Sequence, residues 1–387
     1  MTRVAEGIYD RVLANGRRVF DIVYDLPRRS HGKRNQKWER GFSSLSKAKA
    51  RRAAVVTDQR RGTYVEPAKI TLGEFMMGRF EARHDVGAIR DTTHDGYKRH
   101  LENHVMPVLG GMRLQDLTTV DLNELWAKLA KSGRLDGKGG LSSRTIRSLN
   151  HLISQTLVDA QVHGLVVKNV AIGVSLPAAT RPDLQFWSAE EVRLFLDGVR
   201  EDRDFALYYL DLTTGMRRGE LLGLKWARTD MDIGELEIVQ TVVPVNHKPM
   251  WSVPKTDAGF RTVPLDTRTI DVLRDHRRRQ LEERLAFGSD YVDLDLVFPD
   301  PRGTMFNPEN QSKRFHRRVT RLGLKEIRFH DLRHTYATLA RRSGMDIKAL
   351  SVRLGHENVA TTMNLYQHIP VDMARESAQS VADYILG

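Results

Sequence analysis

The strongest constraint on this sequence is an ordered set of basic residues that ends in a tyrosine. Residues 214–220 read TGMRRGE, residues 330–334 read HDLRH, and Tyr366 follows His356 by ten residues. Guanidinium forks match the oxygens of a phosphate, histidines add hydrogen-bond donors or a base, and a phenol can act as a nucleophile. The part of the chain that holds this set is therefore predicted to fold around a phosphodiester and to attack it.

These segments, in this order, resemble the tyrosine recombinases, also called phage integrases, and the resemblance covers most of the chain. Any one segment is a weak signal, because an arginine in a helix or a tyrosine after a Gly-His pair is common. All of them together in the family's order are a strong signal. The resemblance implies an enzyme that breaks and rejoins DNA.

The resemblance identifies six catalytic positions. They are Arg217, Lys255, His330, Arg333, His356 and Tyr366. Arg217 and Arg333 would share the non-bridging oxygens of the scissile phosphate, and His356 would add a hydrogen bond. His330 and Arg333 are three residues apart at a predicted helix start, so both side chains face the same side. That spacing suits joint coordination of one phosphate.

By the same resemblance, Tyr366 would attack the phosphorus, form a 3′-phosphotyrosyl bond and release a 5′-hydroxyl. His330 would bind the phosphate or accept the proton of Tyr366. Lys255 lies just before the turn at Asp257 and the strand Arg-Thr-Val-Pro, and would protonate the departing 5′ oxygen. Lys248 is the second choice for that lysine. The scheme requires no metal and no other cofactor.

Other chemically suggestive residues have structural interpretations. Arg218 should point elsewhere on a helix than Arg217 and lie on the surface, and Glu220, one turn on, should orient Arg217 or its helix. His330 and His334 have the spacing of a zinc pair, but no third ligand is evident. The competing phenols are Tyr208, Tyr209, Tyr336 and Tyr384, and the first three lie in apolar helical stretches typical of a core.

Composition narrows the range of partners and cofactors. The 387 residues carry a net charge of +12 and a pI near 9.8, which favours a polyanion such as nucleic acid, with a basic solvated surface as the alternative. The lack of cysteine excludes disulfides, thiol catalysis and cysteine-ligated metals. Without a Walker loop, a signal peptide or a membrane-length apolar run, we expect an ATP-independent cytoplasmic protein.

The predicted fold is multidomain, and residues 1–66 form the first domain. Alternating side chains and an Asn-Gly turn predict a small three-stranded sheet. A cap at Ser44 or Ser46 and a glycine stop bound a helix over residues 45–61. Basic residues in segment 28–34 favour a sheet that reads a DNA groove, against a solvated hairpin loop. This domain resembles the arm-binding domain of many integrases.

Residues 67–176 form the second domain, which is predicted to be all-helical. Helix starts are expected at Thr71, Thr92, Thr119 and Ser143. The domain resembles the core-binding domain of the family, one half of a clamp that closes over DNA. Candidate phosphate contacts, with a plain solvated surface as the alternative, are Lys98, Arg99, Arg144 and Arg147.

Residues 177–387 form the third domain, a mainly helical α+β catalytic domain with a tail helix. Prolines mark residues 177–184 as an interdomain linker, and a capping box at 188–191 opens the domain. Two strands are predicted, over residues 236–245 and 251–265.

The resemblance also sets expectations for assembly. The amphipathic tail after Tyr366 would dock on a neighbouring protomer or on its own domain. The protein would act as a homo-tetramer on the core and arm sites of double-stranded DNA, and would integrate and also excise a mobile element in a bacterial host. A host DNA-bending protein and an excision factor are candidate further partners. The alternatives are a type IB topoisomerase-like enzyme, which the amino-terminal domain disfavours, and a non-catalytic regulator, which the filled catalytic positions disfavour.

Overall fold

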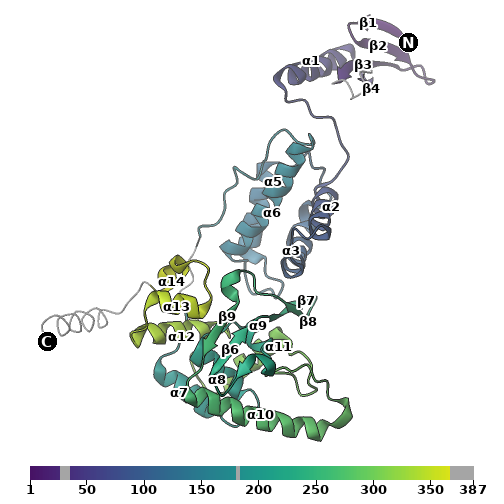
Figure 1. Ribbon diagram of the computed structural model, residues 1–387. Coiled ribbons are helices and arrows are strands. Elements are labelled where there is room, and N and C mark those ends of the chain that lie inside the picture. Colours follow the sequence, from purple (N-terminus) through teal and green to yellow (C-terminus); the bar gives the residue numbers. More distant parts are fainter. Residues whose placement is uncertain (27–34, 180–183, 367–387) are drawn as a thin grey trace, which may run out of the picture. The chain divides into compact units, whose positions relative to one another are not determined.

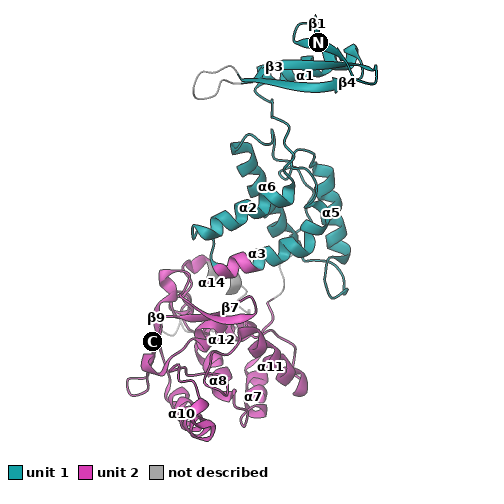
Figure 2. Ribbon diagram, turned by 90° about the vertical axis from the view of Figure 1, so that its right-hand side faces the viewer, with its two compact units in different colours: residues 1–90, 96–180 teal, residues 91–95, 181–387 magenta. Residues whose placement is uncertain are grey.

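The chain folds into two compact units (Figures 1 and 2). The structure is a computed structural model that describes residues 1–26, 35–179 and 184–366, without the side chains of residues 361 and 364–366. One unit comprises residues 1–90 and 96–180, and the other comprises residues 91–95 and 181–387. The division at residue 180 falls within the predicted linker. The predicted tail helix and the basic segment 28–34 lie outside the described residues.

The amino-terminal part is an antiparallel sheet with one helix, but the sheet has four strands and not the predicted three. The elements are β1 (Thr2–Ala5), β2 (Ile8–Val12), β3 (Arg18–Leu26), β4 (Asn35–Phe42) and α1 (Leu45–Arg61), and the strands lie in the order β1-β2-β3-β4. The missed strand is β1, whose side chains are exposed or half-buried and so give no alternating pattern. Gly7, with a φ of 65°, lets the chain reverse between β1 and β2.

The predicted ends of α1 are confirmed. Ser44 accepts a hydrogen bond from the backbone N–H of Lys47, and Gly62 ends the helix in the left-handed conformation. The helix buries Ala48 and Val55 against the sheet, and these two residues form a small core with Ile8, Ile22 and Tyr24.

The helical part of the first unit has its own larger core. Its helices are α2 (Leu72–Asp85), α3 (Asp91–His104, of which residues 96–104 belong to this unit), α4 (Met106–Leu109), α5 (Thr119–Ser132) and α6 (Ser143–Val162). The predicted starts of α2, α5 and α6 agree with the caps Thr71, Thr118 and Ser142, whereas α3 starts one residue before the predicted Thr92. The buried Trp126 donates its indole N–H to Asn150 at 3.2 Å, which satisfies both polar groups inside this core.

The second unit mixes helices with two small sheets, as the α+β prediction expects. Its helices are α7 (Ala189–Gly198), α8 (Phe205–Thr214), α9 (Arg218–Leu222), α10 (Thr267–Phe287), α11 (Pro308–Arg321), α12 (Asp331–Arg342), α13 (Ile347–Leu354) and α14 (Val359–Tyr366). Short 3₁₀ helices are η1 (Trp226–Arg228), η2 (Asp257–Gly259) and η3 (Gly288–Asp290). The predicted capping box is confirmed, because Ser188 and Glu191 bond each other's backbone N–H groups.

The two long strands predicted in this unit are wrong, because four shorter strands take their place. They are β6 (Glu235–Ile238), β7 (Thr241–Val245), β8 (Lys248–Ser252) and β9 (Arg261–Pro264). With β5 (Thr229–Asp230), β6 and β9 form a three-stranded sheet, while β7 and β8 form a separate hairpin. The hairpin turns at Asn246 and His247, with φ values of 47° and 60°. Each predicted strand divides where the chain passes between the two sheets, the first between β6 and β7 and the second between β8 and β9.

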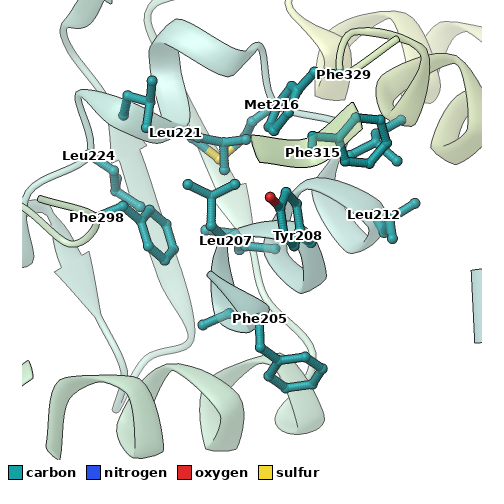
Figure 3. Packing of buried hydrophobic residues seen from close by; sticks show 14 of the residues in the cluster. Phe205, Leu207, Tyr208, Leu212, Met216, Leu221, Leu224, Phe298, Phe315 and Phe329 are labelled. Atoms are coloured by element: carbon teal, nitrogen blue, oxygen red, sulfur yellow. The ribbon is translucent and has the colours of Figure 1, made fainter. Parts of the chain in front are cut away.

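The core of the second unit is rich in aromatic residues around α8, which packs against α7, α10 and α12. Figure 3 shows Tyr208 and Leu207 of α8 in one cluster with Phe315 and Phe329, and the ring centres of Tyr208 and Phe315 are 5.7 Å apart. Full burial of such a side chain contributes about 1.5–3 kcal/mol. The core fixes α8 and therefore the segment after it, which carries Arg217.

Helices long and apolar enough to cross a membrane are absent from the part of the chain that the structure describes.

The buried His276 predicts that the second unit loses stability in mild acid. Its Nε2–H donates to the carbonyl of Val297 at 2.7 Å, and burial lowers its pKa from 6.5 to about 4 although that hydrogen bond opposes the shift. Between pH 6.5 and pH 4 the unfolded chain therefore binds this proton more readily than the folded chain does. The contribution of His276 to the free energy of unfolding is fully present above about pH 6.5 and is lost as the pH falls toward 4.

For His276 alone, we expect a loss of about 2 kcal/mol between pH 7 and pH 5. Denaturant unfolding at both pH values measures it, and His276→Gln, which keeps an N–H for Val297 but does not titrate, should show a smaller loss. An equal loss in the two proteins would contradict the assignment. Other histidines titrate in both proteins and cancel in the comparison.

Candidate active site

The site is organised around the carboxyl end of α13. Gly355 ends this helix with a φ of 65°, and the backbone N–H groups of Gly355 and His356 both bond back to the carbonyl of Ser351. The last carbonyls of a helix lack partners within it and carry partial negative charge. Here the carbonyls of residues 353, 354 and 355 each accept a hydrogen bond from a different arginine. We call residues 353–355 the α13 turn.

The three arginines come from three separate elements. Arg261 in β9 donates to the carbonyl of Arg353 at 2.8 Å, Arg333 in α12 to that of Leu354 at 2.6 Å, and Arg217 before α9 to that of Gly355 at 2.8 Å. His356 follows directly. Of the predicted site residues, the structure therefore brings Arg217, Arg333 and His356 together.

Arg217 occupies the N-cap position of α9 in an extended conformation. Its backbone N–H donates to Glu220 at 2.8 Å, and its Nη1 donates to the other oxygen of the same carboxylate at 2.8 Å. Glu220 therefore holds both the backbone and the side chain of Arg217, in agreement with its predicted orienting role. The Arg217 side chain remains 39 % exposed, so a ligand can reach it.

Glu220 lies between two arginines and is almost completely buried. It also accepts hydrogen bonds from Nη2 and Nη1 of Arg261, at 2.9 and 3.2 Å. Burial alone would raise the pKa of Glu220, but Arg261 and then Arg217 outweigh it and hold the pKa below its ordinary value. The carboxylate is therefore charged at neutral pH and compensates for one of the positive charges of the site.

Arg333 is only 3 % exposed and bridges two chain segments. Its Nη1 donates to the carbonyl of Gly215 at 2.7 Å, which complements the bond to Leu354. A second carboxyl group, Asp211, is buried on α8, and burial raises its pKa well above the ordinary value although Arg333 opposes the shift. The neutral acid is thus favoured, and Asp211 does not cancel the charge of Arg333 as an ionised carboxylate would.

The two histidines of α12 lie at its start. His330 is the N-cap residue, and its ring lies 5.3 Å from that of His334, edge to face. Desolvation, followed by the proximity of His334 and Arg333, lowers the pKa of His330 to about 4. His330 is therefore neutral at pH 7 and can accept a proton. His334 is half-buried.

His356 is half-buried, and its Nδ1 lies 2.8 Å from the hydroxyl oxygen of Thr362 on α14. Desolvation, and then Arg333 and Arg217, lower its pKa to about 4. As a neutral ring, His356 can donate one hydrogen bond to a phosphate while Thr362 fixes its orientation.

Lys255 lies in the loop that joins β8 to β9 and is exposed. This loop approaches the α13 turn, because a Cβ on Gly355 would lie 2.7 Å from the carbonyl oxygen of Ala258. Lys248, the second choice, begins β8 beside the hairpin turn at Asn246. The described contacts thus bring the loop of Lys255, by way of Ala258, against the turn before His356.

Tyr366 is the last residue of α14, and its side chain lies outside the described residues. The helix is tied to the site through Thr362, which is buried and bonded to His356. Tyr208 and Tyr336 are buried, as predicted. Arg218, which was predicted to lie on the surface, is half-buried instead and donates to Ser312 on α11 at 2.5 Å.

Two residues of the site, Arg261 and Asp211, were not predicted from the sequence. Arg261 alternates with the exposed Thr262 and shares its strand face with the buried Val263. A charged residue on the inward face of a strand needs a partner, and that pattern could have identified it. Asp211 carries a comparable signal, because it is a carboxylate within the apolar stretch 205–212.

Comparisons with known proteins agree with this geometry. The family profile described as "Phage integrase family" matches residues 186–372, and that described as "Phage integrase, N-terminal SAM-like domain" matches residues 71–130. A tyrosine recombinase XerC-like protein of Caldanaerobacter subterraneus is 28 % identical over 392 residues, which cover 96 % of this chain and 98 % of that protein.

Solved structures share the fold. The integrase of the transposon Tn1549, in complex with a circular intermediate DNA, has a TM-score of 0.66 at 20 % identity and covers 81 % of this chain and 100 % of its own. A lambda integrase tetramer bound to a Holliday junction has a TM-score of 0.58 at 18 % identity, with 93 % and 94 % covered. The family matches, the shared fold and the clustered arginines lead to one conclusion: the chain belongs to the phage integrase family of tyrosine recombinases, enzymes that break and rejoin DNA.

Proposed function

We propose that this protein is a site-specific recombinase that cleaves DNA through a 3′-phosphotyrosyl bond to Tyr366. The observation that carries the proposal is the convergence of Arg217 and Arg333 on the α13 turn, directly before His356. The cations and the neutral histidines would hold the phosphate and stabilise the charge that develops on its non-bridging oxygens.

The chemical step needs one base and one acid. The phenolic oxygen of Tyr366 forms a bond to phosphorus while the bond from phosphorus to the 5′ oxygen breaks, and His330, which is neutral at pH 7, accepts the phenolic proton. Lys255 gives a proton to the departing 5′ oxygen. The high-energy link remains on the tyrosine, so a 5′-hydroxyl of another strand can reverse the step without ATP.

We further propose three domains, with residues 1–66 on arm sites, residues 67–176 on the core site, and residues 177–387 for catalysis. Support comes from the separate hydrophobic core in each of the three domains and from the similarity to the lambda integrase tetramer. The protein would act as a homo-tetramer on double-stranded DNA in the cytoplasm of a bacterial host, and would integrate and excise a mobile element. A host DNA-bending protein and an excision factor are proposed further partners.

The core-site face of the helical domain is proposed from an open groove of about 390 Å³ between α3 and α6. The residues that line it include Tyr97, Arg144, Arg147, Ser148 and His151. Guanidinium groups and hydroxyls of this kind bind DNA phosphates. Lys98, another candidate, is already bonded to Glu81 at 2.8 Å, and Arg147 donates to the carbonyl of Pro177 at 2.8 Å, which leaves Arg144 as the stronger candidate.

The proposal is tested by incubation of the protein with a pool of DNA fragments from its source replicon and host genome, followed by isolation of covalent adducts. Adducts on a defined sequence, with the protein on a 3′ phosphate and a free 5′-hydroxyl, are expected. Adducts at random sequences would indicate a topoisomerase-like enzyme, and a 5′-phosphate link would contradict the scheme. Tight specific binding without any adduct would indicate a regulator.

A further inference from the structure

Arg261 lies outside the predicted catalytic set, yet it contacts three parts of the site. Its two terminal nitrogens donate to the two oxygens of Glu220, and its Nε donates to the carbonyl of Arg353 in the α13 turn. Its Nη1 also lies 3.3 Å from the carbonyl oxygen of Gly259, at the end of the loop that carries Lys255. The side chain is only 7 % exposed, so these partners account for its position.

The end of the Lys255 loop that follows Lys255 contacts the α13 turn and Arg261. Between β8 and β9, the short helix η2 packs its Ala258 carbonyl against Gly355, and the next contact is that of Gly259 with Arg261. A Cβ on Gly355 would also lie 2.7 Å from Nη1 of Arg261. The guanidinium therefore fills the space between the loop and the α13 turn.

We propose that Arg261 is a positioning residue that places the loop of Lys255 for proton donation to the 5′ oxygen. The inference rests on the proposed function, because it takes Lys255 as the acid. Arg261 fixes this loop relative to Glu220, which holds Arg217, and relative to the turn before His356. One guanidinium thus sets the distance between the residues that bind the phosphate and the residue that protonates the leaving group.

The planar fork of arginine is essential to this role. Its N–H groups point in fixed directions in one plane, so they can serve a carboxylate on one edge and backbone carbonyls on another. A lysine at position 261 would keep the charge beside Glu220 but would lose the other contacts. Arg261→Lys should therefore fold and bind DNA while the loop of Lys255 shifts.

The test compares single-turnover cleavage of two DNA substrates that carry the cleavage site. One has the ordinary phosphodiester, and the other has sulfur in place of the bridging 5′ oxygen, so that a thiolate departs without needing a proton. Arg261→Lys should be slower by about 100-fold on the oxygen substrate. It should regain most of that loss on the sulfur substrate, because no acid is then required.

Matched variants separate the possible failures. Lys255→Ala should show the same pattern of rates. If its cleavage rate does not recover on the sulfur substrate, Lys255 is not the acid and the proposal is wrong. If Lys255→Ala recovers but Arg261→Lys is equally slow on both substrates, or is not slow at all, the positioning role is wrong. Arg318→Lys is the control, because Arg318 is a partly buried arginine paired with Asp202 and Asp204. It should cleave both substrates at the wild-type rates. Its melting temperature measures how much stability the protein loses when a paired guanidinium outside the site is replaced by an ammonium.

Discussion

A protein carrying Tyr366→Phe is expected to form no covalent adduct with DNA and to bind its sites with unchanged affinity. The substitution removes only the oxygen that would bond to phosphorus, while the arginines that hold the phosphate remain bonded to the α13 turn. The phenol makes the covalent step possible, so its loss should abolish the adduct and not merely slow it. Electrophoresis under denaturing conditions measures the adduct, and a mobility shift measures binding.

Tyr336→Phe is the matched control for this result. Tyr336 lies on α12, one turn after Arg333, and its buried ring faces Gly215 and the guanidinium of Arg353. Because burial raises the pKa of Tyr336, its phenol is a poor nucleophile. The control protein should form adducts as the wild type does. Adducts that persist in Tyr366→Phe and disappear in Tyr336→Phe would move the nucleophile to α12.

Much of the fold is local in origin and could therefore be predicted. The ends of α1 follow from a serine cap and a glycine that tolerates a left-handed conformation, and the start of α7 follows from a capping box. The strands were predicted less well, since pairing partners decide where a strand ends. The break after β6 occurs because the chain passes to a second sheet, and no residue in that segment marks the change.

The site was predictable only in part, for a similar reason. The motifs around Arg217, Arg333 and His356 occur in the same order as in the family, so these residues could be identified from the sequence alone. Arg261 begins the Arg-Thr-Val-Pro strand that helps to locate Lys255, but nothing in that strand assigns it a role, and its importance arises from contacts with Glu220 and Arg353, which are 41 and 92 residues away. The alternation of the strand marks Arg261 as an inward-facing charge, but a single sequence does not show which distant residues it contacts.

Arg333→Lys should lower the rate of covalent cleavage by about 100- to 1000-fold, the loss that follows removal of one preorganised donor from a developing negative charge. Lysine keeps a positive charge, but its single ammonium cannot serve the carbonyls of Gly215 and Leu354 and a phosphate together. The buried carbonyl that loses its partner should also destabilise the second unit by about 1–3 kcal/mol. Rates are measured at saturating DNA, so that weaker binding does not contribute.

The exposed Arg342 on the same helix provides the control, because its guanidinium lies over the ring of Phe186 and not in the site. Arg342→Lys should cleave at the wild-type rate. If Arg333→Lys is less stable but cleaves at the wild-type rate at saturating DNA, the role of Arg333 is only to hold α12 against the α13 turn. A loss of rate far greater than the loss of stability would instead assign Arg333 to the phosphate, because a guanidinium that two carbonyls already hold is ordered before the ligand binds.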